Sequence, residues 1–504
     1  MGLEFNKDDY TLEEKVYKGK TLKYKLYSDI LYCEKPVDIK YETLNVKVPV
    51  SYGDEKIDAE GAPIFLGLGC AGLLSTTAKS GGLFAPPPAD GPKPPKKASE
   101  ITSSEEWEAM AGGEGHSGGG IAGMKMLGGM KEMPGPPPTE DGEMIPPDGS
   151  RWGKLVAGLV VVEPGCRGRE NVTEDGIFYG KAPAMVTDLK AAIRYMRHNK
   201  DVFPGDTERI IASGGSGGGW QSTLLAASGN CEWFEPYLEE IGAAKERDDI
   251  FASYSTSPII DHENMDGGIE FQGGALLEDE KDKAVSKEIR GEFAKYLEKA
   301  NYVGHNGYGK LTIDNLGEYI TKEYLIPDAE RFLKNLSEDR RKEYLASRDW
   351  IKYDGKNASF TFEDFGLYAP RSAAVPAVDD IKFEQPEPNL YGDEHTPARN
   401  VTDIALRLRT GDENAKVDEK LMEIVHSQNP VWHVKNKNTT VAKHWWIRHG
   451  ACDSCTSVSP VVLFASALEE EGKNVNLRLV WDGAHCEDDD HEDFMKWVKK
   501  ITTI

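Results

Sequence analysis

The N-terminal part of the chain carries two kinds of hydrophobic pattern. Within residues 22–50, the runs LKYKLY and LNVKVPV alternate hydrophobic and polar residues with a period of two. Because this period places successive side chains on opposite faces of a strand, it predicts the antiparallel start of a sheet. The run APIFLGLG at 62–69 is almost wholly apolar and ends in glycines, which is typical of a buried strand that leads into a loop.

A regular alternation of strands and helices is predicted farther along the chain. Apolar, β-branched runs predict the strands, and amphipathic periodicity predicts the helices. The predicted strands are 154–164, 208–215, 442–450 and 475–483, and the predicted helices are 183–200, 217–230, 459–472 and 493–501. Strands and helices that alternate in this way form a mostly parallel sheet covered on both faces. We therefore predict an α/β fold.

Two segments interrupt this alternation. Residues 76–150 are rich in Pro, Gly and Met and have no sustained period, which predicts a long surface excursion. A Met-rich flap over a binding site is the alternative, because Met adapts to varied apolar ligands. Residues 254–430 are mostly charged helical and loop sequence, which predicts an inserted lid domain. The predicted core then consists of residues 1–253, including the Pro/Gly/Met-rich insertion, and residues 431–504.

Composition narrows the classes of partner. The formal net charge is -25, which argues against nucleic acid and anionic membrane surfaces because both would repel the chain. There is no apolar stretch long enough for a transmembrane helix, and the N-terminus lacks the basic and apolar regions of a signal peptide. We expect a cytoplasmic protein, although a secreted chain that has lost its leader would look the same. We expect no metal and no cofactor.

Two serines lie in the pattern Gly-x-Ser-x-Gly. Ser216, at 214–218, follows a predicted strand and opens a predicted helix, which is the setting of a nucleophile on a tight strand-to-helix turn. Ser117, at 115–119, has only Gly- and Met-rich sequence around it, which predicts a solvated loop. The alternatives for Ser216 are a structural glycine turn and a phosphate-binding loop, but the turn lacks the lysine of a P-loop.

A serine nucleophile needs a histidine base, which in α/β-hydrolases comes last along the chain. His485 lies just past the late predicted strand 475–483 and before the closing helix. His491 stands in an acidic run where a helix begins, while His444 and His449 fall inside a predicted strand. We therefore predict that His485 is the base.

The base in turn needs a carboxylate that orients it. Asp453 follows the predicted strand 442–450 and precedes a helix, as the acid of an α/β-hydrolase does. Asp482 is the alternative, but it stands only three residues before His485 on the same loop. We favour Asp453.

Several motifs together resemble one family. The segments RIIASGGSGGGWQSTLLAASGN, WIRHGACDSCTS and WDGAHCEDDDHEDF are similar to the matching segments of bacterial tannases, the tannin acylhydrolases, which are related to feruloyl esterases. Further similar segments are LNVKVPV, KAPAMVTDLKAAIRYMRHN, FPGDTERI and AVPAVDDIKFEQPEPNLYG. The resemblance covers most of the chain except 76–150 and much of 280–365.

The resemblance implies an α/β-hydrolase core with a large lid. It also implies a catalytic triad of Ser216, Asp453 and His485. The oxyanion hole would be formed by the N–H groups of Gly217 and of a glycine after an early strand, here Gly72. Such an enzyme cleaves carboxylic esters through an acyl-enzyme.

The substrate pocket departs from the family. In tannases a Lys, a Glu and an Asp hold the three hydroxyls of the galloyl ring. The Glu position matches Glu387, but the Lys position falls on Ala373 and the Asp position on Cys455. Because a polar pocket discriminates through these contacts, galloyl, hydroxybenzoyl and cinnamoyl esters all remain open as substrates. An acyl-enzyme peptidase, an acyltransferase and a catalytically silent binding protein are the alternative functions.

Most of the seven cysteines stand near predicted site residues. Cys70 precedes the proposed oxyanion glycine, Cys452 and Cys455 lie on either side of the proposed acid, and Cys486 follows the proposed base. Cys166 lies in a loop after a central predicted strand. We expect reduced thiols that act as small hydrophobic residues. A disulfide between the acid loop and the histidine loop, through Cys486, is the alternative.

Overall fold

The computed structural model describes residues 2–78, 151–371 and 374–502. Its central sheet runs in the order β1-β2-β3-β6-β5-β7-β8-β13-β14, with β4 paired to β3. The strands are β1 (Thr11–Tyr17), β2 (Lys20–Leu31), β3 (Thr43–Tyr52), β4 (Glu55–Lys56), β5 (Pro63–Gly67), β6 (Val160–Pro164), β7 (Asp206–Gly215), β8 (Ala252–Thr256), β13 (His444–Gly450) and β14 (Asn474–Val480). The first strands pair antiparallel, and those from β6 to β14 pair parallel. The mostly parallel sheet of an α/β-hydrolase is therefore confirmed.

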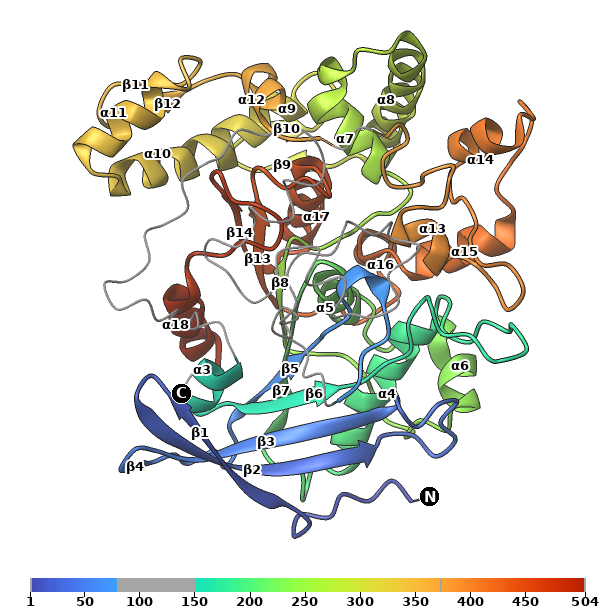
Figure 1. Cartoon of the computed structure of the whole chain (residues 1–504), viewed down its shortest axis with the longest axis vertical. Coiled ribbons are helices and arrows are strands. Elements are labelled where there is room, and N and C mark those ends of the chain that lie inside the picture. Colours follow the sequence, from blue (N-terminus) through green and yellow to red (C-terminus); the bar gives the residue numbers. More distant parts are fainter. Residues whose placement is uncertain (1, 79–150, 372–373, 503–504) are drawn as a thin grey trace, which may run out of the picture.

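The central strands are apolar throughout because both faces of the sheet are covered. In β5, Ile64 and Leu66 pack into one hydrophobic cluster, whereas Phe65 between them packs into another on the opposite face. Helices α4 (Ala184–His198), α5 (Gly217–Ala227) and α17 (Val458–Glu470) cover the first face. Helices α3 (Arg151–Val156) and α18 (His491–Thr502) cover the second (Figure 1).

The predicted strand at 154–164 is correct only in its second half. Its first residues belong to α3, and the chain then turns at Gly158, whose φ is +90°. Such a φ is readily adopted by glycine alone, so the apolar run is broken there into a helix and a strand. β8 was not predicted, because its sequence ASYST is polar although every residue in it is buried.

A long insertion lies between β8 and β13. Its helices are α7 (Met265–Gly273), η4 (Gly274–Leu276), α8 (Glu280–Ala300), α9 (Leu316–Ile320), η5 (Thr321–Leu325), α10 (Ile326–Asn335), α11 (Glu338–Ala346), α12 (Phe362–Tyr368), α13 (Pro386–Leu390), α14 (Asp403–Thr410), α15 (Glu419–Ser427) and α16 (Pro430–Asn436). Two short hairpins, β9–β10 (Val303–Gly304, Gly309–Lys310) and β11–β12 (Lys352–Tyr353, Ala358–Ser359), join some of them. Helices α7 to α12 gather beyond one end of the sheet (Figure 1). The predicted lid boundaries at 253/254 and 430/431 fall inside β8 and α16.

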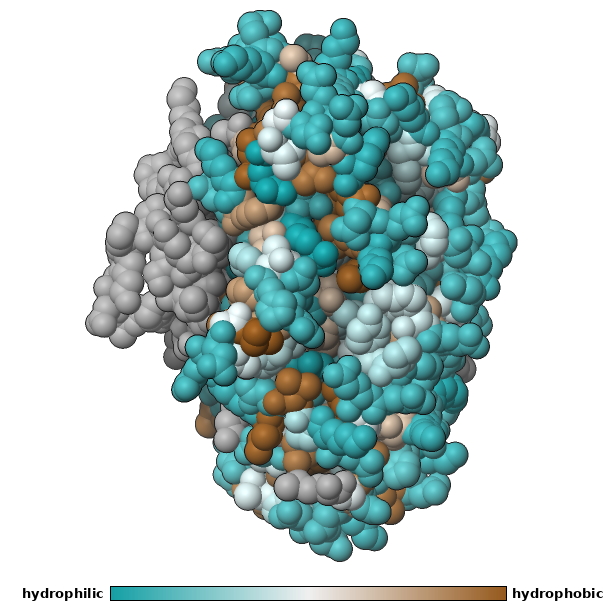
Figure 2. All heavy atoms as spheres, turned by 90° about the vertical axis from the view of Figure 1, so that its right-hand side faces the viewer, coloured by the Kyte–Doolittle hydropathy of each residue, from teal (hydrophilic) through white to brown (hydrophobic). Residues whose placement is uncertain are grey.

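Three short helices complete the core: η1 (Ala71–Leu73), η3 (Glu232–Phe234) and α6 (Glu235–Glu240). The predicted excursion at 76–150, with Ser117, lies outside the described residues from residue 79 onward. The face in Figure 2 is mainly hydrophilic, and hydrophobic residues appear on it only in a broken band. Among the described helices, none combines the length and the apolar character that crossing a bilayer requires.

Candidate active site

Ser216 stands on the turn between β7 and α5. Its φ of 55° and ψ of -122° form a tight turn that side chains rarely adopt, as in a nucleophile elbow. The glycines around it are required by space, because a Cβ at Gly214 would meet the backbone of Gly218. The Ser216 Oγ is buried and has no hydrogen-bond partner in the described part of the chain. The turn therefore holds the Ser216 hydroxyl at the N-terminus of α5. There it can pair with a side chain of another segment or with a substrate.

Asp453 and His485 form a direct pair. The His485 Nδ1 lies 2.8 Å from the Asp453 Oδ2. The backbone N–H groups of Cys455 and Thr456 donate to Asp453 Oδ1 at 2.8 and 3.3 Å, which fixes the carboxylate. These residues stand on the loops after β13 and β14, and the N–H of Cys452 donates to Gly483 O across the two loops. The predicted acid and base are thus placed together.

The pair controls the charge of both groups. Burial alone would raise the pKa of Asp453, but the charge and the hydrogen bond of His485 outweigh it and lower that pKa to about 2. Burial alone would lower the pKa of His485, but Asp453 outweighs it and raises that pKa well above its usual value. The His485 Nε2 is buried and has no hydrogen-bond partner within the described residues. It is the free end of the pair.

The end of β8 joins the serine turn to the histidine loop. The N–H of Ser216 donates to Thr256 O at 3.0 Å, and the N–H of Cys486 donates to the Ser257 Oγ at 2.9 Å. A Cβ at Gly215 would lie 3.0 Å from the Cys486 Sγ, so the residue before Ser216 touches the residue after His485. The structure therefore brings the three predicted residues to one region. It forms the Asp453–His485 bond, but no bond between Ser216 Oγ and His485 Nε2.

The alternative acid, Asp482, has a different set of partners. Its carboxylate accepts hydrogen bonds from the hydroxyls of Tyr344 and Tyr368, each at 2.6 Å, and lies 3.5 Å from Arg348. These three residues belong to the insertion, and the Cys452 thiol of the acid loop lies 3.8 Å from Asp482 Oδ1. Asp482 thus connects the insertion to the histidine loop and is not the partner of His485.

The other candidate histidines have structural surroundings. His449 is buried, and its Nε2 lies 3.9 Å from Asp453 Oδ2; burial lowers its pKa to about 4. His491 begins α18 and shares a hydrogen bond with the Tyr254 hydroxyl at 3.3 Å. His444 shares one with Asn474 at 2.9 Å. None of the three carries the bond that orients His485.

The two predicted oxyanion glycines lie on two elements that pack against each other, Gly72 in η1 and Gly217 at the start of α5. Gly72 is in η1 with a φ of 60°, and a Cβ at Gly217 would clash with Cys70 O, one residue before η1. The Leu73 N–H is 3.1 Å from the same Cβ position, so η1 packs against the start of α5. The carbonyl of Gly72 accepts a hydrogen bond from Arg169 Nε at 2.9 Å. Sequence reasoning missed Arg169, since a lone arginine in a loop has no pattern that marks it.

Solved structures of known proteins share this fold. Residues 179–306 match the BD-FAE family, whose members are α/β-hydrolases of the feruloyl esterase type. The tannin acyl hydrolase of Lactobacillus plantarum is 27% identical with a TM-score of 0.76, and the match covers 99% of this chain and 98% of that one. The tannase of Fusobacterium nucleatum is 26% identical with a TM-score of 0.75, and the match covers 99% of both chains. The chain is a tannase-like α/β-hydrolase. A comparison with curated proteins gave no match.

This tannase-like protein has the enzyme class of its structural relatives, the carboxylic ester hydrolases. One of them is a tannin acyl hydrolase in complex with 3,4-dihydroxybenzoate, which is 27% identical with a TM-score of 0.75 over 99% of this chain and 98% of that one. Another is described in complex with ethyl gallate.

Two of the three predicted pocket residues lie in the described part of the tannase-like chain. Glu387 lies in the first turn of α13 and is buried; burial raises its pKa to about 7, although Arg169 opposes the rise. Cys455 is exposed, and its thiol lies within 4.8 Å of ligand atoms of Asp453 and His485. Ala373 lies outside the described residues.

A buried lysine that the sequence did not single out connects Glu387 to the oxyanion region. The Lys181 Nζ donates to the carbonyls of Arg169, Asn389 and Pro397 at 2.7, 2.8 and 2.8 Å. Burial lowers its pKa to about 7. Because Asn389 is on α13, the bonds of Lys181 hold the helix of Glu387 beside the Arg169 loop.

All seven cysteines are free thiols, so the disulfide through Cys486 is not formed. Cys486 faces Thr256 O, with its Sγ at 3.9 Å. Cys70 and Cys166 lie beneath the oxyanion region with their Sγ atoms 3.4 Å apart. The cysteines therefore act mainly as small buried groups, with Cys455 as the exposed exception.

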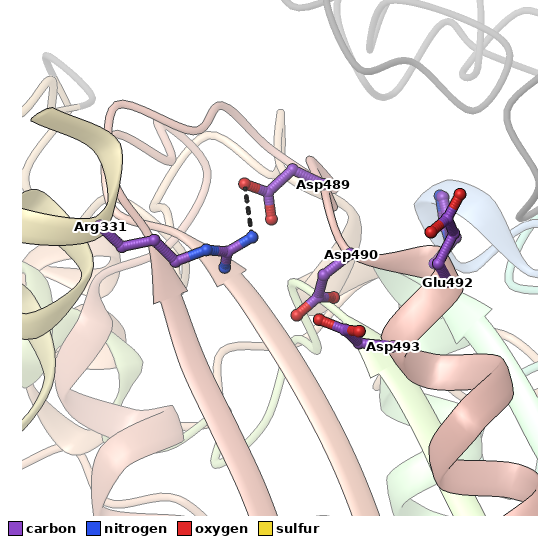
Figure 3. Close-up of a pocket in the computed structure, with 6 residues that line it drawn as sticks. Arg331, Asp489, Asp490, Glu492 and Asp493 are labelled. Atoms are coloured by element: carbon purple, nitrogen blue, oxygen red, sulfur yellow. Dashed lines mark hydrogen bonds and ion pairs between the residues drawn. The ribbon is translucent and has the colours of Figure 1, made fainter. Parts of the chain in front are cut away.

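Figure 3 shows a pocket that contains none of the predicted site residues. Acidic side chains from the start of α18 line it, and Arg331 reaches Asp489 at 3.5 Å. Asp490 also pairs with Arg448 and Arg478.

Within residues 2–78, 151–371 and 374–502, two clusters have side chains of metal-binding type: Asp453, Cys455 and His485 at the acid loop, and Asp488, Asp489 and Asp490 before α18. Their carboxylates are already bound by His485, Tyr254 and the arginines. The hydrogen bonds and ion pairs to these partners account for the positions of the carboxylates in both clusters.

Proposed function

We propose that this tannase-like protein hydrolyses aromatic carboxylic esters through an acyl-enzyme on Ser216. The observation that carries the proposal is the bond from His485 Nδ1 to Asp453 Oδ2, which leaves Nε2 buried and without a partner among the described residues. The histidine loop also touches the serine turn, since a Cβ at Gly215 would lie 3.0 Å from the Cys486 Sγ. A histidine oriented by one nitrogen and free at the other is the base that a serine nucleophile needs. The aromatic ligands of the structural relatives support an aromatic acyl group.

The reaction would begin with attack of the Ser216 Oγ on the ester carbonyl carbon, while His485 Nε2 takes the hydroxyl proton. Asp453 stabilises the imidazolium that forms. The N–H groups of Gly217 and Gly72 would hold the negative oxygen of the tetrahedral intermediate, at the N-terminus of α5. Collapse releases the alcohol, which takes the proton from His485. Water then attacks the acyl-enzyme in the same way, and the carboxylic acid leaves.

Glu387 would bind a hydroxyl of the acyl ring. It is buried, and Arg169 lies close enough to influence its charge. In its ionised form the carboxylate accepts a hydrogen bond from a phenol. Because such a contact distinguishes hydroxylated from plain rings, Glu387 would favour galloyl, hydroxybenzoyl or hydroxycinnamoyl esters over benzoyl esters.

The test compares wild type with Ser216→Ala on methyl gallate, methyl 4-hydroxybenzoate and methyl ferulate. We expect Ser216→Ala to lose about 10³-fold or more of kcat on every ester that wild type cleaves. Ser117→Ala is the matched control, because Ser117 has the same glycine pattern, and it should keep wild-type rates. Equal rates for Ser216→Ala and wild type would contradict the proposal.

A further inference from the structure

Arg371 is a buried cation in the segment that follows α12. Its side chain is only 7% exposed, and its Nη2 donates to Glu270 Oε1 at 2.7 Å and to Ala374 O at 3.4 Å. The Nε and Nη1 groups are buried and have no hydrogen-bond partner within the described residues. A buried N–H group without an acceptor costs free energy. A guanidinium whose N–H groups lack acceptors therefore indicates a position where a ligand could supply one.

Arg371 lines a cavity together with the loop of the proposed catalytic acid. This small cavity is bounded by Arg371, by residues of α7, and by the loop after β13. Its lining includes Gln272, Pro370, Arg371, Asp453, Thr456 and Ser457. The cavity volume of ≈ 10 Å³ admits about one polar atom. A group that enters this cavity would be a terminal substituent of a larger molecule bound at the active site.

The N–H groups of Arg371 that lack a partner among the described residues favour an anionic terminal substituent. Glu270 neutralises one edge of the guanidinium, and it is itself held by the Ser286 hydroxyl at 2.6 Å. Asp453 also borders the cavity, but His485 binds its Oδ2 and backbone N–H groups bind its Oδ1. The Nε and Nη1 groups of Arg371 therefore stay available to an incoming acceptor. Arg371 lines this cavity, and a guanidinium binds an anionic oxygen through charge-assisted hydrogen bonds.

We propose that Arg371 is a specificity residue that binds an anionic oxygen on the acyl ring of the substrate, either a carboxylate or a phenolate. The proposal rests on the function proposed above and adds to it the class of ring substituent. Arg371 takes no part in proton transfer. It lowers KM for esters whose ring carries the anionic oxygen, and it does not help esters whose ring ends in an apolar group.

The experiment measures kcat/KM for three esters that differ in one substituent: methyl 4-carboxybenzoate, methyl 4-hydroxybenzoate and methyl 4-methylbenzoate. The first two separate the carboxylate from the phenol as the source of the oxygen. We expect Arg371→Gln to lower the ratio of the preferred anionic ester to the methyl ester about tenfold or more, the value of one charge-assisted hydrogen bond. An unchanged ratio, with all three esters slowed equally, would overturn the proposal.

Two control variants distinguish a loss of substrate binding from a loss of folding. Arg371→Lys keeps a positive charge beside Glu270, so it should fold and should recover part of the preference. Arg340→Gln makes the same charge change at an exposed position of α11 and should leave all three rates unchanged. A thermal unfolding curve of each variant accompanies the kinetics.

A binding measurement separates this proposal from the hydrolase proposal. Calorimetric titration of Ser216→Ala with 4-carboxybenzoate, 4-hydroxybenzoate and 4-methylbenzoate needs no turnover. We expect the preferred anionic ligand to bind at least tenfold more tightly than 4-methylbenzoate, and the difference to vanish when Arg371→Gln is added. Equal binding of all three ligands by Ser216→Ala would overturn the role of Arg371, even if the esters are cleaved.

Discussion

The Nε of Arg169 donates to the carbonyl oxygen of Gly72 at 2.9 Å. This bond holds the turn that carries one proposed oxyanion donor. The N–H of Arg169 also donates to Leu73 O at 3.1 Å, and Lys181 binds the Arg169 carbonyl. Because the Arg169 charge also acts on Glu387, one buried residue connects the oxyanion turn to the proposed ring-binding residue.

Arg169 is therefore predicted to be a positioning residue. Arg169→Leu should lower kcat roughly 10- to 100-fold, somewhat less than loss of a whole oxyanion donor, and should change KM for methyl benzoate little. Arg169→Lys, which keeps a donor, should recover part of kcat. Steady-state kinetics of both variants check this, and a loss confined to KM would speak against it.

The Asp453–His485 pair makes a prediction about pH. Activity requires neutral His485, so the rate rises with pH through the His485 pKa. Asp453 raises that pKa, and Asp453→Asn should therefore shift the acid limb of the kcat/KM profile to lower pH. The same variant should lower kcat by roughly 10⁴-fold. An acid limb that moves to higher pH, or does not move, would contradict the pairing.

Asp482 provides the contrast to Asp453. Asp482→Asn removes the charge from two tyrosine hydrogen bonds and one ion pair, so the free energy of unfolding should fall by about 1–3 kcal/mol. Its kcat should stay within a few-fold of wild type. Denaturant unfolding and kinetics of Asp482→Asn beside Asp453→Asn measure both effects. A rate loss as large as that of Asp453→Asn would mean that Asp482 is the acid.

Glu387 should impose its own pH dependence on binding. Its pKa of about 7 means that it ionises as the pH rises through neutrality. The ionised form accepts a hydrogen bond from a ring hydroxyl, so KM for methyl 3,4-dihydroxybenzoate should fall between pH 6 and pH 8, an interval of about one unit on each side. KM for methyl benzoate should not change with pH, and Glu387→Gln should remove the pH dependence of KM for methyl 3,4-dihydroxybenzoate. If KM changed with pH in the same way for both esters, Glu387 would not be the residue that binds the ring hydroxyl.

The sequence predicted those parts of the fold and site that have a local signature. Ser216 was separated from Ser117 by its strand and helix, and Asp453 from Asp482 by its place after a strand. β8 was missed because its serines are buried through partners distant in sequence, such as the 2.7 Å bond between Ser222 and Ser253. Arg169 and Arg371 were missed for the same reason. Their roles arise from contacts with distant residues, and no periodicity records such contacts.

The central claim is that Ser216 carries the acyl group. The most direct measurement mixes the enzyme with excess 4-nitrophenyl benzoate, follows release of 4-nitrophenol in the first turnover, and maps the quenched protein by peptide mass spectrometry. We expect a burst equal to the enzyme concentration and a benzoyl group on the peptide that contains Ser216, both absent in Ser216→Ala. Turnover with a benzoyl group on another residue, or an undiminished burst in Ser216→Ala, would contradict it.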